Sequence, residues 1–136
     1  MVTGRILLVE ADVVLGAVLA EVLRHNGYEV SVMHTLIKGE IDRIESLSAV
    51  ILDIDTTPTE NVLAWLNRFQ PHDESLPLVL IGLQVPQELR DRSPFRFGHQ
   101  QPNALPLVQK PFRNEELLAA LRQAQESSVP GSHRAL

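Results

Sequence analysis

Several short runs of this chain are apolar throughout, with no polar side chain between their members. They occupy residues 6–9, 50–52 and 78–83. A strand with one face in water alternates apolar and polar residues, whereas an unbroken apolar strand is covered on both faces. Between these runs, apolar residues recur at the three- and four-residue spacing of a helix. The pattern therefore predicts a parallel sheet with helices packed on both of its faces.

The order of the elements predicts a single α/β domain with a doubly wound, five-stranded parallel sheet. We expect strands at 5–10, 28–33, 49–54, 78–83 and 105–109. We expect helices after Asp12, across 37–47, from Thr59, at 87–92 and after Phe112. Four prolines interrupt residues 84–106, which predicts an irregular or shortened fourth helix region. The domain is expected to span 1–126, with 127–136 as a flexible tail.

Composition narrows the classes of function. The formal net charge of the 136 residues is −5, and no cluster of Lys and Arg is present, which argues against nucleic-acid binding. The absence of cysteine excludes disulfides and thiolate metal sites. The first apolar run is too short for a signal peptide or a membrane span. We therefore expect a cytoplasmic protein with no membrane association.

Three charged residues stand just past the carboxyl ends of apolar runs. Glu10 follows residues 6–9, Asp53 follows 50–52, and Lys110 follows 107–109. The carboxyl ends of parallel strands meet at one edge of a sheet, which is where open α/β folds place their chemistry. We expect one reactive aspartate there, held between an acid and an ammonium group.

These segments, in this order and at this spacing, resemble the receiver domain of two-component response regulators, the CheY-like family. The resemblance covers about residues 5–125 and includes the Lys110-Pro111-Phe112 signature. It implies a flavodoxin-like, CheY-like (βα)5 fold. It also implies a Lys110–Pro111 peptide bond of the cis form.

The resemblance implies that Asp53 is the phospho-acceptor and that Lys110 binds its carboxylate or the phosphoryl group. Receivers use Mg²⁺ in this transfer, and Glu10, Asp53 and Asp55 are the candidate ligands here. Ala11 stands where the family usually has a direct metal ligand. We therefore expect magnesium binding to be weak or absent.

The two switch positions of the family also lack their functional groups. Gly82 occupies the place of a Ser or Thr, and Leu107 occupies the place of an aromatic residue. A hydrogen bond to a charged group contributes about 1.5 to 3 kcal/mol, so the loss at Gly82 weakens any response to phosphorylation. The sequence predicts an atypical receiver-like domain, not an enzyme, that works through protein–protein contacts with phosphorylation of Asp53 weak or lost.

Two alternatives remain open at this point. The first is a working receiver that takes a phosphoryl group from a histidine kinase onto Asp53. The second is a phosphohydrolase of the haloacid dehalogenase type, because residues 53–57 fit its Asp-x-Asp-x-Thr signature. That family places the motif on its first strand and needs a later acidic pair on a strand, which this chain lacks. Partners are expected to be proteins, including a histidine kinase, and a homodimer is compatible with the sequence.

Overall fold

The protein forms a layered α/β structure in a computed structural model, which describes residues 4–35, 47–69, 77–93 and 105–127. Five parallel strands lie in the order β2-β1-β3-β4-β5. Their bounds are β1 Gly4–Val9, β2 Tyr28–Met33, β3 Leu47–Asp53, β4 Leu78–Gly82 and β5 Leu107–Gln109. The helices are α1 Val13–His25, α2 Thr59–Phe69, α3 Gln87–Arg92 and α4 Asn114–Ser127.

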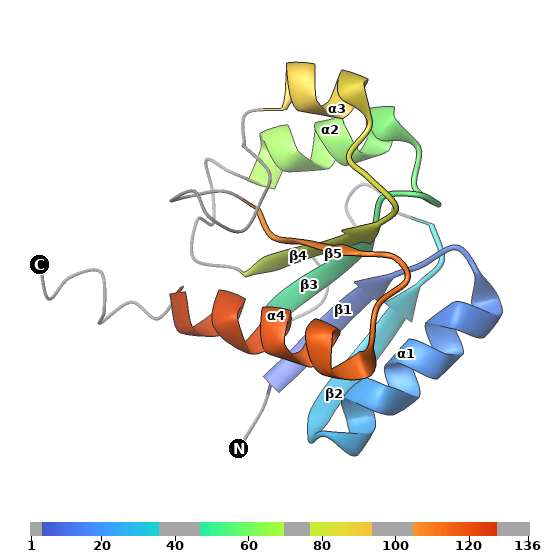
Figure 1. The fold of residues 1–136 in the computed structure, drawn as a ribbon, viewed down its shortest axis with the longest axis vertical. Coiled ribbons are helices and arrows are strands. Elements are labelled where there is room, and N and C mark those ends of the chain that lie inside the picture. Colours follow the sequence, from blue (N-terminus) through green and yellow to red (C-terminus); the bar gives the residue numbers. More distant parts are fainter. Residues whose placement is uncertain (1–3, 36–46, 70–76, 94–104, 128–136) are drawn as a thin grey trace, which may run out of the picture.

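This architecture confirms the predicted doubly wound sheet. Figure 1 shows α1 and α4 on one face of the sheet and α2 and α3 on the other. The strand order reverses between β1 and β3, and such a switch point is where doubly wound folds bind ligands. The helix expected across 37–47 lies largely outside the described residues. Its last residue, Leu47, belongs instead to β3, where it pairs with Arg5 of β1.

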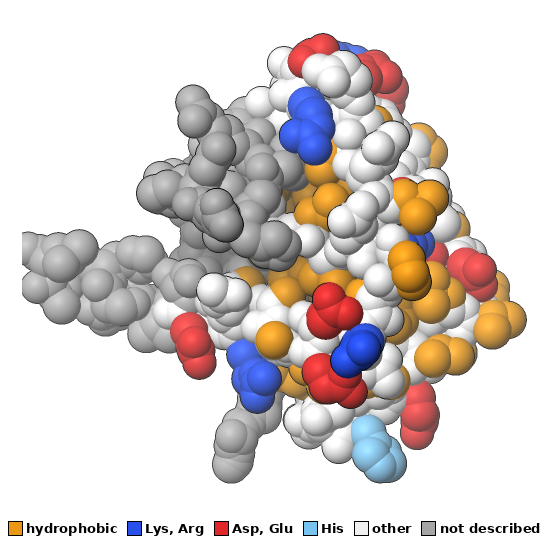
Figure 2. All heavy atoms as spheres, viewed as in Figure 1, with side chains coloured by type: hydrophobic (Ala, Val, Ile, Leu, Met, Phe, Trp, Pro, Cys, Tyr) orange, Lys and Arg blue, Asp and Glu red, His pale blue; other side chains and the backbone are white. Residues whose placement is uncertain are grey.

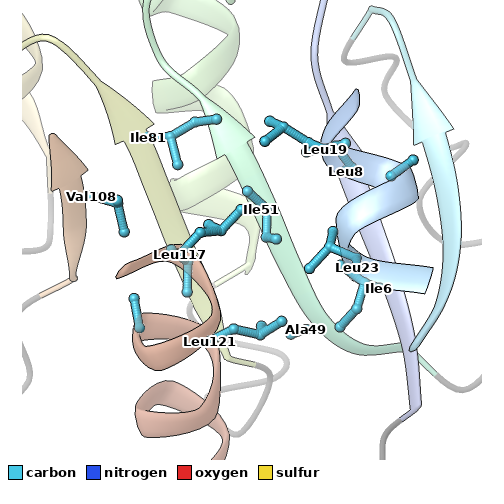
Figure 3. Close-up of a cluster of buried hydrophobic side chains, with 13 residues drawn as sticks. Ile6, Leu8, Leu19, Leu23, Ala49, Ile51, Ile81, Val108, Leu117 and Leu121 are labelled. Carbon is cyan, nitrogen blue, oxygen red and sulfur yellow. The ribbon is translucent and has the colours of Figure 1, made fainter. Parts of the chain in front are cut away.

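Two apolar layers hold the helices to the sheet. Because successive side chains of a strand point to opposite faces, Ile6 and Leu8 enter one layer, while Leu7 and Val9 enter the other. The first layer also contains Leu23 of α1 and is shown in Figure 3. Leu117 and Leu121 of α4 complete it from the neighbouring helix. The second layer receives α2 and Leu89 of the six-residue α3, which is the shortened helix that the prolines predict.

Helix α1 is less buried than its apolar sequence suggests. Leu19 and Leu23 are buried, but Val14 and Val18 are exposed by 73% and 52%, although they share the same helical spacing. The apolar stripe of this helix is wider than the face that meets the sheet. Leu83, expected at the end of the fourth strand, lies beyond β4 and is 59% exposed.

Glycines at the two ends of α1 serve different purposes, which gives a first prediction. Gly27 follows the helix with a φ of +95°, a conformation that L residues adopt at a free-energy cost of about 1–2 kcal/mol. Gly27→Ala is therefore expected to lower the free energy of unfolding by about 1 kcal/mol in urea denaturation.

Gly16→Ala is the matched control within the same helix. A Cβ at Gly16 would lie 3.5 Å from the nearest atoms of Glu10 and Val32, which is ordinary contact. Because alanine favours a helix over glycine, this variant is expected to gain about 0.5–1 kcal/mol. Equal effects of the two substitutions would contradict the assignment of Gly27 to a left-handed cap.

Candidate functional site

The four acidic and basic residues singled out in the sequence lie together at one edge of the sheet. Asp53 ends β3, while Glu10 and Lys110 directly follow β1 and β5. Asp55 lies in the loop after β3. Glu10 and Asp53 are completely buried, whereas the Lys110 side chain is 19% exposed. The lysine therefore lies nearer the surface than the two buried acids.

Both carboxylate oxygens of Asp53 have a donor. Lys110 Nζ donates to Asp53 Oδ2 at 2.7 Å, and the backbone N–H of Asp55 donates to Asp53 Oδ1 at 2.8 Å. Burial opposes ionisation of Asp53, but hydrogen bonds from Glu10 and Lys110 outweigh it and lower the pKa of this carboxyl. Burial also opposes the charge on Lys110, yet its bond to Asp53 raises the ammonium pKa. The pair is therefore ionised at neutral pH.

Glu10 is the acid whose ionisation is disfavoured. Burial and a hydrogen bond with Asp53 raise its pKa to about 7. Its Oε2 atom accepts from the backbone N–H of Asp12 and from Thr56 Oγ1, both at 3.1 Å. Its Oε1 atom is buried and accepts no hydrogen bond from the described residues. A proton on Glu10 allows it to donate to Asp53, which reconciles the unpartnered oxygen with the raised pKa.

Asp55 makes contacts on the opposite side of the pocket. Its Oδ1 and Oδ2 atoms accept from the backbone N–H of Leu83 at 3.1 and 3.0 Å. Its Oδ2 atom also lies 3.4 Å from Lys110 Nζ. Asp55 therefore faces the ends of β4 and β5, where its charge meets the lysine.

The two positions that correspond to the family's switch residues lie on β4 and β5. Gly82 ends β4 and pairs with Gln109, and its backbone oxygen accepts from the N–H of Lys110 at 2.9 Å. Leu107 is half-buried in β5 and packs against the second apolar layer. The Lys110–Pro111 bond is cis, as the resemblance implied.

A magnesium ion needs several oxygen ligands in near-octahedral geometry. Glu10 Oε1 is the buried oxygen without a partner, but Ala11 has no donor side chain and Asp55 is bound to Leu83 and Lys110. Within the described ranges, no group of three or more His, Cys, Asp or Glu residues could hold a metal ion. In this arrangement the side chains do not fit a magnesium site built from several carboxylates.

Thr56 and His34 belong to this site but were not predicted from the sequence. The Thr56 hydroxyl donates to Glu10, and His34 Nδ1 lies 2.9 Å from the backbone oxygen of Glu10. Thr56 stands only three residues after Asp53, so its place in the loop after the acceptor strand was the available signal. His34 follows β2 directly, in the same way that Glu10 follows β1.

No family model matches the chain. A curated relative is the uncharacterized transcriptional regulatory protein YkoG of Bacillus subtilis, to which this chain is 33% identical over 125 residues. The match covers 91% of this chain and 52% of YkoG, so the chain spans about half the length of that relative.

Solved structures establish the fold. The signal receiver domain of an HD domain-containing protein from Pseudomonas fluorescens Pf-5 matches with a TM-score of 0.71 and 22% identity, over 91% of this chain and 95% of that one. CheY4 of Vibrio cholerae matches with a TM-score of 0.66 and 20% identity, over 90% and 98% of the respective chains. A CheY-like receiver domain protein from Methanospirillum hungatei JF-1 matches with a TM-score of 0.68 and 18% identity, over 91% of this chain and 94% of that one.

Proposed function

Starting from the CheY-like receiver fold of this chain, we propose that it is an atypical receiver-like domain of phosphorelay signal transduction. It works mainly through protein–protein contacts, and phosphorylation of Asp53 is weak or lost. Magnesium binding is correspondingly weak or absent. The relative YkoG is named as a transcriptional regulator, but the chain described here carries no basic cluster, so we assign it protein partners and not nucleic acid.

The observation that carries this proposal is the state of Asp53. A nucleophilic carboxylate must present a free oxygen lone pair to the group it attacks. Asp53 is 0% exposed, and each of its oxygens already accepts a short hydrogen bond. Each oxygen keeps a second lone pair, but Asp53 has no exposed surface, so a phosphodonor can reach the carboxylate only if surrounding residues move, which slows the reaction.

Exposed apolar side chains support a role in protein contacts. Val13, Val14 and Val18 on α1 are exposed by 64%, 73% and 52%, and Leu83 by 59%. Figure 2 shows hydrophobic side chains gathered on the side of the molecule where α1 lies. Exposed apolar side chains that gather on one side of a molecule favour contact with another protein. We also assign contacts to the fifth strand, the last helix and residues 84–106, of which 94–104 lie outside the described residues.

The alternative is a working receiver that takes a phosphoryl group from a histidine kinase. The close Lys110–Asp53 pair favours it, because an ammonium group at 2.7 Å can bind a phosphoryl oxygen as well as the carboxylate. The proposals share a fold and differ in whether Asp53 reacts.

A phosphohydrolase of the haloacid dehalogenase type has less support. Such an enzyme needs its second aspartate free for proton transfer, whereas both oxygens of Asp55 accept from Leu83. We therefore propose a signalling role without catalysis. Among the described helices, none has the length and apolar character needed to cross a membrane. A cytoplasmic location remains our proposal.

The proposal predicts little reaction with small phosphodonors. After incubation with Mg²⁺ and acetyl phosphate or beryllofluoride, the intact mass and the amide shifts near Asp53 are expected to stay those of the untreated protein. Asp53→Asn is the control for reaction at other sites. A saturable change in the wild type that is absent from Asp53→Asn would reject the proposal and establish the working receiver.

Partner recovery tests the other half of the proposal. A pull-down with wild type, Asp53→Asn and Asp53→Ala is expected to recover the same proteins in equal amounts, since docking does not depend on phosphorylation. Recovery that disappears in both variants would instead indicate a partner that reads the state of Asp53.

A further inference from the structure

Asp55 is the third acid of the site, and its carboxylate is held by contacts with the ends of β4 and β5. Both of its oxygens accept from the backbone N–H of Leu83, at 3.1 and 3.0 Å. Oδ2 lies 3.4 Å from Lys110 Nζ, and the Asp55 side chain is only 25% exposed. Asp55 is therefore held by one backbone donor and one ammonium group.

One of these two donors, Lys110, is also the cation beside Asp53, where an oxyanion on that carboxylate would need it. Lys110 Nζ lies 2.7 Å from Asp53 Oδ2, so it is adjacent to any group bonded to that carboxylate. The Leu83 N–H is joined to the same ammonium through Asp55. A phosphoryl group carries strongly accepting oxygens that need such charge-assisted bonds. In this structure the Asp55 carboxylate already makes such contacts, with Lys110 and with the N–H of Leu83.

Gly82 makes the position of Asp55 possible. A Cβ at Gly82 would lie 3.0 Å from Asp55 Oδ1 and 2.7 Å from Ile54 Cγ1, both closer than ordinary contact. Any larger residue there would press on the Asp55 carboxylate. The absence of a side chain at Gly82 therefore leaves the space that the Asp55 carboxylate needs.

We propose that Asp55 is a built-in anion that competes with a phosphoryl group on Asp53 for the ammonium of Lys110, and so disfavours phosphorylation. This inference rests on the proposed function and deepens it, because it names the group that makes phosphorylation weak. A phosphoryl group would add further negative charge beside Asp53 and Asp55, which already share the ammonium of Lys110. Its entry is therefore favoured when Asp55 moves away from Lys110.

The test uses inorganic phosphate as the probe, in an Asp53→Asn background where no transfer can occur. Phosphate is titrated while the amide shifts of Leu83 and Lys110 are followed by NMR. The double variant Asp53→Asn/Asp55→Ala is expected to bind phosphate about tenfold more tightly than Asp53→Asn, which is the factor for one hydrogen bond to a charged group. Equal affinities would overturn the inference.

Asp53→Asn/Asp91→Ala is the matched control. Asp91 is an exposed acid of α3 that accepts from Gln87 and takes no part in the pocket, so it removes the same charge elsewhere. Its phosphate affinity is expected to equal that of Asp53→Asn. A gain as large as that of the Asp55 variant would show a general charge effect and would overturn the inference.

A second variant covers the case in which Asp55→Ala unfolds. In Asp53→Asn/Asp55→Asn the amide oxygen can still accept from Leu83, but it no longer carries a charge that competes for Lys110. This variant is also expected to bind phosphate more tightly than Asp53→Asn, and an unchanged affinity counts against the inference.

The inference and the proposed function fail in different measurements. Complete Asp53-dependent labelling of the wild type by acetyl phosphate would end the proposed function. The role of Asp55 would still be tested by the phosphate affinities of the Asp53→Asn variants, which do not depend on phosphoryl transfer. If both hold, Asp55→Ala is expected to take up label on Asp53 faster than the wild type.

Discussion

Lys110→Met is expected to lower the free energy of unfolding by about 3–5 kcal/mol at pH 7, because it leaves the buried charge of Asp53 without its cation. Asp53 has no exposed surface, so water cannot replace the ammonium group. Methionine keeps most of the side-chain volume of lysine, so the lost free energy of unfolding comes from the missing charge and not from packing. Urea denaturation followed by circular dichroism measures it.

The pairing also predicts an asymmetry and a rescue. Asp53→Asn is expected to destabilise less, since Lys110 is 19% exposed and keeps Asp55 at 3.4 Å. The double variant Asp53→Asn/Lys110→Met is expected to be more stable than Lys110→Met alone, because no buried charge remains. Arg92→Met removes a cation from exposed pairs with Glu60 and Glu88 and should change stability only slightly, because exposed ion pairs contribute little. A Lys110→Met loss no larger than this control would contradict the buried pair.

Stability is expected to fall as pH rises from about 4.5 to about 7, because Glu10 must then lose a proton inside the protein. Its pKa is about 7 in the folded chain against an ordinary value of 4.5. In this interval the folded state binds more protons than the unfolded state, so deprotonation favours unfolding. The full shift corresponds to about 3 kcal/mol.

Glu10→Gln isolates this contribution. The amide is neutral at every pH and can still donate to Asp53, so the variant should be more stable than the wild type at pH 8 and about equal to it at pH 4.5. Glu29→Gln, an exposed acid on β2, serves as the control. Parallel stability–pH curves for wild type and Glu10→Gln would show that Glu10 titrates normally.

The sheet and its helices could be predicted from the sequence because their signals are local. Unbroken apolar runs located β1, β3 and β4, and the charged residues after those runs located the pocket. The exposure of Val14 and Val18 could not be predicted, because helical spacing shows which residues share a face but not how much of that face a neighbouring element covers.

The detailed contacts of the pocket depend on geometry that the sequence does not display. Asp55 was expected as a magnesium ligand, and that role stays untested, but its bonds to Leu83 depend on the course of the chain after β4. Those bonds involve a backbone N–H, which every residue except proline carries. The position of Thr56 after Asp53 indicated that it lies near the site, but its contact with Glu10 joins loops 46 positions apart, so the sequence did not indicate this partner.

The two apolar layers have a consequence for the acids at the edge of the sheet. In the register of β1 and β3, Val9 lies opposite Leu52, so the next positions along the two strands are Glu10 and Asp53. A slip of one residue would turn every side chain of a strand to the wrong layer, and burial forbids it. The apolar interior therefore sets the spacing of these two carboxyl groups, and core substitutions that keep the alternation of the strands leave that spacing unchanged.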